Sequence, residues 1–311
     1  MRQLRILIIG QSEFGRAALQ AFLDKGHTIA GVFCAPEAPG TKPDPLKEAA
    51  LACGVPVHHF SSLRSAEAHE RMREERPDLV VMAYVLQFAP ASLLSMAPLG
   101  AIQYHPSLLP RHRGPSAISW AIASGEKRAG LTVFRPTDGL DEGPIVLQKA
   151  CDIGPDETLG ELYFNKLFPM GIAALLEAAD MVAAGDVREQ EQPVAGATYE
   201  GWLRDEAAQI HWGLHVDVIY NLIRACNPSP GAWTMLGGTR VRVYDCRKLP
   251  TPTFHSVAGA PGTIAEVTRT SIIVNANGGR IEMLRVRPEG GAKMGAAEFA
   301  AKAGLVSATE R

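Results

Sequence analysis

Short apolar runs alternate with amphipathic stretches along the N-terminal part of the chain. Four of these runs are predominantly apolar: residues 6–9, 28–33, 78–83 and 100–104. Runs of this kind are typical of strands that are buried on both faces of a parallel sheet. Helical patterns separate them, at residues 14–25, 46–53 and 66–75. The alternation predicts an α/β fold with a Rossmann-like, doubly wound, mostly parallel sheet.

The pattern changes in the C-terminal part. Residues 159–184 form one long amphipathic stretch, which predicts a closing helix, and a polar stretch follows it. Short strand patterns then alternate with Gly-Gly, Asn-Gly-Gly and Pro-Gly turns: residues 240–244, 262–267, 271–275 and 280–286. These strands predict a small antiparallel, OB-like β-barrel. We therefore expect an N-terminal domain over 1–188, a linker over 189–208 and a barrel domain over 209–311.

Length and charge agree with two domains. The chain has 311 residues, more than a single hydrophobic core usually supports. Its net charge of −2 gives no reason to expect a strong nucleic-acid-binding protein. From Arg204 onward there are 13 Lys/Arg and 9 Asp/Glu, a balance of +4, so the preceding residues carry −6. This asymmetry permits an anionic partner at the C-terminal part, and a solvated surface is the other interpretation.

Five widely spaced cysteines, with no Cys-x-x-Cys pair, argue against a disulfide framework and predict a reducing, cytoplasmic setting. His211 and His215 have the spacing of one helical face. No third ligand is near them in the sequence, so we predict no metal site. The N-terminus carries no signal-peptide pattern. No apolar run approaches the roughly 18 residues that a membrane span needs, and we expect no membrane partner.

The loop after the first apolar run is the first candidate for ligand binding. Four residues separate its glycines, Gly10 and Gly15, so it lacks the G-x-G-x-x-G spacing that brings a pyrophosphate close to the backbone. No acidic residue ends the second run, where a dinucleotide site holds a ribose. We therefore predict no nicotinamide cofactor. The loop places Ser12 at a helix N-terminus, which suits a polar or anionic substrate, and a simple strand-to-helix turn is the alternative.

A histidine and an acidic loop supply the candidate chemistry. His105 ends an apolar strand, and residues just beyond such strand ends face the ligand crevice of open α/β sheets. Gln103 lies two residues earlier and therefore on the same face. A later strand, 131–134, enters the irregular acidic loop 136–143. An amide for an oxyanion, an imidazole for a proton and a carboxylate for the imidazole suit acyl transfer, and several hydrolases and transferases fit that description.

Two stretches make the sequence recognisable. Residues 103–114, Gln-Tyr-His-Pro-Ser-Leu-Leu-Pro-Arg-His-Arg-Gly, and 138–143, Asp-Gly-Leu-Asp-Glu-Gly, resemble the signature of the 10-formyltetrahydrofolate-dependent formyltransferase family. The resemblance continues through 197–200, 223–233 and 260–264. The last two stretches resemble the C-terminal barrel that methionyl-tRNA formyltransferase shares with the hydrolase domain of 10-formyltetrahydrofolate dehydrogenase. The resemblance runs almost end to end.

The family's site residues can be transferred by position. The resemblance implies that His105 and Asp141 are catalytic, with 10-formyltetrahydrofolate as the formyl-donor co-substrate of a folate-binding N-terminal domain. Gln103 occupies the place of an asparagine that polarises the formyl oxygen in the family's transferases, and its amide reaches about one bond further. The residues expected to bind the folate are Tyr84, Val85, Leu86, Gln87, Phe88, Asp138, Gly139 and Leu140. For Val85 and Phe88, ordinary core packing is the alternative.

The sequence leaves several candidates for the acceptor of the formyl group. We expect Ser12, Ser107 and Arg113 to contact substrate. A small-molecule or carrier-bound acceptor, either an amine or a thiol, is our first expectation, followed by water and then by methionyl-tRNA. The tRNA enzyme carries a basic insertion after its second strand, whereas residues 35–45 are short here and hold one lysine. A folate-binding or RNA-binding relative that has lost catalysis is the alternative of a different class.

Overall fold

The computed structural model describes residues 2–251 and 259–307, which form two compact units. The first comprises Met1–Gly114, Gly130–Cys151 and Phe164–Tyr199, and the second Pro115–Ala129, Asp152–Tyr163 and Glu200–Arg311. The sequence pattern predicted one contiguous division at 189–208. Two N-terminal segments join the second unit instead, because helix α5 (Ala117–Ala123) packs against helix α8 (Val216–Ala225).

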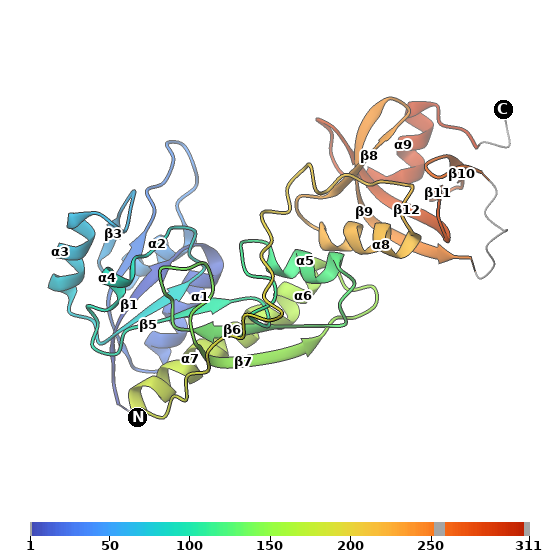
Figure 1. The fold of residues 1–311 in the computed structure, drawn as a ribbon. Coiled ribbons are helices and arrows are strands. Elements are labelled where there is room, and N and C mark those ends of the chain that lie inside the picture. The colour runs from blue at the N-terminus through green and yellow to red at the C-terminus, as the bar shows by residue number, and fades with distance from the viewer. Residues whose placement is uncertain (1, 252–258, 308–311) are drawn as a thin grey trace. The chain divides into compact units, whose positions relative to one another are not determined.

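A seven-stranded sheet forms the centre of the first unit, in the order β3-β2-β1-β4-β5-β6-β7 (Figure 1). Its strands are β1 (Arg5–Gly10), β2 (Thr28–Cys34), β3 (Val57–His59), β4 (Leu79–Ala83), β5 (Ala101–His105), β6 (Arg128–Phe134) and β7 (Ile145–Asp152). The strands β3, β2, β1, β4 and β5, which are neighbours in this order, are mutually parallel. Strand β6 runs antiparallel to β5. The predicted Rossmann-like, mostly parallel sheet is confirmed, with β1 and β4 at the point where the strand order reverses.

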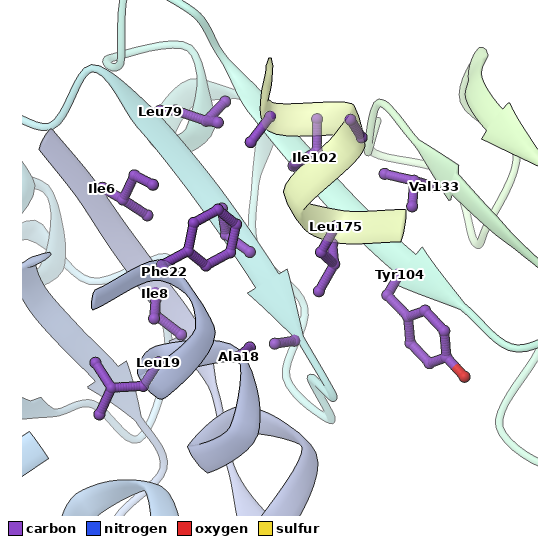
Figure 2. Close-up of a cluster of buried hydrophobic side chains, with 14 of the residues drawn as sticks. Ile6, Ile8, Ala18, Leu19, Phe22, Leu79, Ile102, Tyr104, Val133 and Leu175 are labelled. Carbon is purple, nitrogen blue, oxygen red and sulfur yellow. The ribbon is translucent and has the colours of Figure 1, made fainter. Parts of the chain in front are cut away.

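Helices cover both faces of this sheet. They are α1 (Ser12–Asp24), α2 (Pro45–Ala52), α3 (Ala66–Glu75), α4 (Ala91–Leu94) and α7 (Phe168–Ala184). Alternate residues of β1 enter two different cores: Ile6 and Ile8 pack in one, and Leu7 and Ile9 pack in the other. Figure 2 shows the first core, where Phe22 of α1 and Leu175 of α7 lie against the strands. Burial on both faces explains why these strands have continuous apolar sequences.

The predicted closing helix over 159–184 is present as three parts: α6 (Leu159–Leu162), a π-helical turn (Tyr163–Leu167) and α7. This 26-residue stretch has a mean hydropathy of 1.6 over its best 18 residues, so length and composition alone would allow it to cross a membrane. That corrects the expectation that no stretch qualifies. Core helices meet the same criterion, and Ala174, Leu175 and Ala178 of α7 are fully buried in the first core.

The second unit contains an antiparallel sheet in the order β10-β11-β12-β9-β8, with β13 paired to β12. The elements are β8 (Ala232–Leu236), β9 (Thr239–Pro250), β10 (Ile264–Val267), β11 (Ile272–Ala276), β12 (Gly279–Pro288), β13 (Met294–Gly295) and α9 (Ala296–Ala303), together with α5, α6 and α8. The separate antiparallel β domain is confirmed. Over 200–251 and 259–307 no pairing between end strands β10 and β8 is recorded, so closure into a barrel stays a prediction.

Candidate active site

The two residues predicted to be catalytic meet at the carboxyl end of β5. His105 is the last residue of β5, and Asp141 lies in the loop that follows β6. Both side chains are buried, with 7% and 8% of their surface exposed. The Nδ1 atom of His105 lies 3.6 Å from Oδ2 of Asp141, which also accepts a hydrogen bond of 2.9 Å from the Gly114 N–H. The pairing inferred from sequence is therefore present in the fold.

The other nitrogen of the His105 ring defines its tautomer. Nε2 lies 2.8 Å from the backbone carbonyl oxygen of His112. Because a carbonyl oxygen only accepts hydrogen bonds, Nε2 carries the hydrogen in the neutral ring. Nδ1 is then the basic nitrogen, and it faces the Asp141 carboxylate. A proton that arrives at Nδ1 is stabilised by a carboxylate in a site that is largely closed to water.

A buried threonine holds the loop that follows His105. Thr132 lies opposite His105 in the β5–β6 register and is fully buried. Its hydroxyl donates to the Ser107 carbonyl oxygen (2.7 Å) and accepts from the Leu109 N–H (3.2 Å). Gln148 of β7 adds hydrogen bonds to the Thr132 hydroxyl (2.9 Å) and to the Leu109 carbonyl oxygen (3.0 Å). The start of the loop is thus fixed by side chains of the two neighbouring strands.

The acidic loop is closed at its base by backbone contacts. The Arg135 N–H donates to the carbonyl oxygen of Pro144 at 2.9 Å. A Cβ on Gly143 would lie 1.7 Å from the Arg135 carbonyl oxygen, so only glycine fits this turn. Asp141 has a φ of +52°, in the left-handed region that side chains rarely adopt. The tight base and the unusual backbone conformation together direct the carboxylate inward.

Backbone strain is concentrated at this edge of the sheet. The non-glycine residues with positive φ in the described chain are Ser12, Arg76, Tyr84, His112 and Asp141. Arg76 ends helix α3, and the other four belong to the predicted donor, acceptor and catalytic segments. Each such conformation costs about 1–3 kcal/mol and persists only where the surroundings enforce it. Their grouping is independent support for a functional site at this edge.

The residues predicted to bind folate lie in two segments. Leu86 and Leu140 expose 55% and 58% of their surface, and Tyr84 and Phe88 are also exposed, so apolar surface in these two segments is accessible to a ligand. The guanidinium of Arg64 lies 4.3 Å from the Phe88 ring centre. Core packing is therefore not the main role of Phe88.

One hydrogen bond joins the two folate segments. The carboxylate of Asp138 accepts from the Ala91 N–H at 2.9 Å, at the start of α4. The partly buried Gln87 donates to the Phe60 carbonyl oxygen (2.7 Å). Val85 packs against the core that contains Leu7 and Ile9 of β1. Gly139 donates its N–H to the Thr137 hydroxyl at 3.2 Å. These contacts hold the segments, and folate binding by the eight residues stays a prediction.

Gln103 is placed as the sequence predicted. It shares a face of β5 with His105 and pairs in register with Met82 of β4 and Phe134 of β6. Its side chain is half-buried, and within 2–251 and 259–307 no hydrogen bond of its amide is recorded. Its two N–H groups are thus available to a substrate oxygen.

The three residues assigned to substrate differ in their surroundings. The Ser12 N–H donates to both carboxylate oxygens of Asp44, at 3.0 and 2.8 Å. The Ser107 hydroxyl is buried and donates to the Arg111 carbonyl oxygen at 2.7 Å. The Arg113 guanidinium is buried, with 6% exposed, among protein side chains. Ser107 and Arg113 therefore hold the loop around His105, and their contact with substrate stays a prediction.

Several residues that the sequence analysis missed complete the site. Thr132 fixes the catalytic loop, Gln192 contacts Asp141, and Thr198 and Tyr199 contact the segment around His112 and Arg113. Thr132 carried a usable signal, because it is a polar residue in an otherwise buried strand. Gln192 carried none, because its partners lie 49 to 79 residues away in the chain.

Other reactive groups lie outside this chemistry. Burial raises the pKa of the Cys34 thiol, at the end of β2, to about 11, so it is not a nucleophile at neutral pH. No metal-binding group of His, Cys, Asp or Glu occurs among the described residues. His215 has a structural role, because its Nδ1 accepts from the Asp217 N–H (3.3 Å) at the start of α8.

Comparison with known sequences identifies related proteins. Residues 2–178 match the family model described as formyl transferase, and residues 203–304 match the one described as formyl transferase, C-terminal domain. Mitochondrial 10-formyltetrahydrofolate dehydrogenase of Mus musculus is 39% identical over 294 residues, which cover 91% of this chain and 31% of the relative. Methionyl-tRNA formyltransferase of Symbiobacterium thermophilum is 36% identical, covering 95% and 91%. The chain thus spans about a third of the length of the dehydrogenases it matches.

Solved structures share the fold. HypX from Aquifex aeolicus, in complex with tetrahydrofolic acid, has a TM-score of 0.67 at 16% identity, covering 97% of this chain and 48% of that one. An N-formyltransferase from Helicobacter canadensis, in complex with folinic acid and dTDP-3-aminofucose, has a TM-score of 0.70 at 16% identity, covering 91% and 99%. At this identity the likeness supports the fold alone.

Proposed function

Because the chain belongs to the formyltransferase family, we propose that it removes the formyl group from 10-formyltetrahydrofolate and transfers it to an acceptor amine or carrier thiol, releasing tetrahydrofolate. The observation that carries this proposal is the buried pair of His105 and Asp141, 3.6 Å apart at the end of a parallel strand. Relatives named for 10-formyltetrahydrofolate chemistry support the donor.

The proposed reaction is an acyl transfer without oxidation or reduction. The acceptor lone pair attacks the formyl carbon, and the carbonyl oxygen becomes an oxyanion that the Gln103 amide stabilises. His105 takes the acceptor's proton at Nδ1, and Asp141 stabilises the resulting imidazolium. The bond between the formyl carbon and N10 then breaks, and the proton passes from Nδ1 to N10. A placed acid–base group contributes about 10²–10⁴-fold, and an oxyanion donor about 10²–10³-fold.

The exposed residues of the folate segments suit the donor. Tyr84, Leu86, Phe88 and Leu140 expose apolar surface, which a planar pterin ring can cover. The donor is handled as substrate, so no resident cofactor is part of this mechanism.

Water is the second candidate acceptor. Transfer to water would give formate and tetrahydrofolate, and two relatives named for 10-formyltetrahydrofolate rather than for an acceptor, at 39% and 36% identity, cover 91% and 95% of this chain. Methionyl-tRNA is the third, favoured by the 36% identical transferase. Against it, residues 35–45 offer one lysine, and the nearby Lys47 is paired with Glu37 at 2.6 Å. RNA phosphates usually need several basic contacts.

Incubation with 10-formyltetrahydrofolate separates these acceptors. Tetrahydrofolate release is followed without acceptor, with a panel of amines and thiols, and with methionyl-tRNA. Acceptor-dependent release that is lost in His105→Ala supports the transferase. Release of tetrahydrofolate at the full rate in buffer alone would contradict the transferase and support a hydrolase. Folate binding without release under any condition would contradict both.

We also propose a reducing, cytoplasmic setting for the protein. All five cysteines are free thiols in the structure, in agreement with their wide spacing in the sequence. Labelling of the native protein extracted under thiol-blocking conditions tests this, and any disulfide-linked pair would contradict it.

A further inference from the structure

The chain between the two family-matched regions is part of the site. One match ends at residue 178 and the next begins at 203, so residues 189–199, which we term the bridging segment, belong to neither. The sequence analysis assigned the whole of this segment to a linker. In the structure it contacts strand β7, the loop that carries Asp141 and the loop that follows His105.

Backbone and hydroxyl contacts anchor the two ends of the bridging segment. At its start, Gln190 and Ile145 exchange backbone hydrogen bonds of 2.8 and 3.0 Å. Near its end, the Thr198 hydroxyl accepts from the His112 N–H (2.8 Å), and the Thr198 carbonyl oxygen accepts from the Arg113 N–H (3.0 Å). The segment is thus tied to the strand after the acidic loop and to the loop that follows His105.

Between these anchors, Gln192 reaches the acidic loop. Its Nε2 donates to the carbonyl oxygens of Asp141 (2.9 Å) and Gly143 (2.8 Å). Its Oε1 accepts from Nε (3.1 Å) and from a terminal nitrogen (2.8 Å) of Arg113. The side chain is buried, and all its donor and acceptor capacity is used by these four bonds. A surface linker has no reason to bury a fully bonded amide.

These bonds connect the two partners of His105. Arg113 directly follows His112, whose carbonyl oxygen lies 2.8 Å from Nε2 of the His105 ring. Asp141, on the other side of Gln192, lies 3.6 Å from Nδ1. The guanidinium of Arg113 also contacts Tyr199 and Glu142. The Tyr199 hydroxyl in turn donates a hydrogen bond of 3.1 Å to the Glu142 carboxylate. Two connections therefore join the partners of His105 through the protein: the Gly114 N–H bonds the Asp141 carboxylate directly, and the Gln192 amide joins Arg113 to the Asp141 backbone.

We propose that Gln192 is a positioning residue that holds Asp141 in its left-handed conformation, with its carboxylate aimed at Nδ1 of His105. The inference rests on the proposed function for its effect on turnover. It extends that function by placing part of the catalytic machinery in a segment outside both family-matched regions. The Gln192 amide bonds to Arg113, which we expect to contact substrate, and it acts on Asp141 through the backbone of the acidic loop.

Two variants and a matched control test this role. Gln192→Ala removes all four bonds, while Gln192→Glu keeps an acceptor for Arg113 but loses both N–H donors to the acidic loop. We expect both to lower kcat about 10²-fold, the cost typical of a misplaced catalytic group, with little change in KM for 10-formyltetrahydrofolate. Gln190→Ala is the control, because its side chain is exposed and its backbone bonds remain. Full kcat in Gln192→Glu would overturn the proposal.

Combining the Gln192 and Asp141 substitutions distinguishes a positioning role of Gln192 from a general effect on stability. If Gln192 acts through the carboxylate, Gln192→Ala lowers the residual kcat of Asp141→Asn much less than it lowers that of the unmodified protein. Equal fold-losses in the two backgrounds would show independent effects and overturn the proposal. Near-ultraviolet circular dichroism verifies that each variant is folded.

Hydrogen exchange tests, independently of turnover, whether Gln192 holds the acidic loop in place. Amides of residues 137–143 and of Gly114 should exchange faster in Gln192→Ala than in Gln190→Ala. Unchanged exchange would overturn the positional role even if activity fell. If exchange rises but the unmodified protein never releases tetrahydrofolate, the proposed function fails and the positional role stands.

Discussion

The Nδ1 atom of His105 and the Oδ2 atom of Asp141 face each other at 3.6 Å, while Nε2 of the same ring is committed to the His112 carbonyl oxygen. One ring nitrogen is therefore bonded to the backbone, and in the proposed mechanism the other carries the proton. This division gives His105 and Asp141 separate proposed roles that substitution can test.

Asp141→Asn should lower kcat by about 10²–10⁴-fold, because the amide keeps the shape of the carboxylate but loses the negative charge that stabilises protonated His105. Steady-state release of tetrahydrofolate measures the effect. Asp186→Asn, an exposed change of the same chemistry, is the control. A near-normal kcat in Asp141→Asn would remove this residue from the mechanism.

Phe88→Ala should raise KM for 10-formyltetrahydrofolate about tenfold, because a large apolar contact with the pterin is lost. Phe88 is 41% exposed, so its removal leaves no large cavity and the thermal midpoint should change little. Leu51→Ala is a matched control, because Leu51 is 58% exposed on α2. Equal KM values in the two variants would place the pterin elsewhere.

Gly10→Ala should destabilise the protein by about 1–3 kcal/mol, since a Cβ at this position meets backbone that cannot yield. The added atom would lie 2.3 Å from the carbonyl oxygen of Ala83, its register partner at the end of β4. Urea unfolding measures the loss. At Gly213, where a Cβ meets nothing within 4 Å, the same substitution should be close to neutral. Comparable losses would show that the contact is not responsible.

His27 should make stability fall as the pH drops below about 6.5. Burial first, and then the charge of Lys25, lowers the pKa of His27 from its ordinary value of 6.5. Below 6.5 the unfolded chain therefore binds more protons than the folded chain, and the free energy of unfolding decreases until the pH passes the folded pKa. His27→Asn keeps an acceptor near Nδ1 for the Leu4 N–H and cannot titrate in this range. Urea unfolding between pH 5 and 8 should show a flatter profile for the variant, and parallel profiles would contradict the assignment.

The sequence predicted the central strands because they are buried on both faces. Ile8 and Ile9 enter different cores, so residues 6–9 of β1 must all be apolar and the run is easily recognised. Strand β7 was missed because Val146 is its one buried residue, while the positions from Leu147 to Asp152 alternate between half-buried and exposed. Helix α8 was also missed, although Val216, Ile219, Tyr220 and Ile223 recur with helical spacing and are buried.

The residues of the candidate site also differ in whether a local sequence pattern could predict them. His105 and Gln103 could be placed together because strand alternation is local. The meeting of His105 with Asp141 depended on the neighbouring strands β5 and β6, and the family resemblance supplied the expectation. Gln192 could not be found in this way, since its function arises from contacts with Arg113 and Asp141, which are remote in the chain. No local pattern distinguishes it from a solvated glutamine.

The division of the chain restricts how this protein can change by recombination. The chain passes from one unit to the other five times, after residues 114, 129, 151, 163 and 199. A single crossover near residue 200 would separate α8 from α5, whose Ala117, Ala121 and Ile122 are buried. Exchange of the C-terminal part between homologues therefore requires that both sides of the α5–α8 contact match. We expect the two units to have been inherited together rather than shuffled as independent modules.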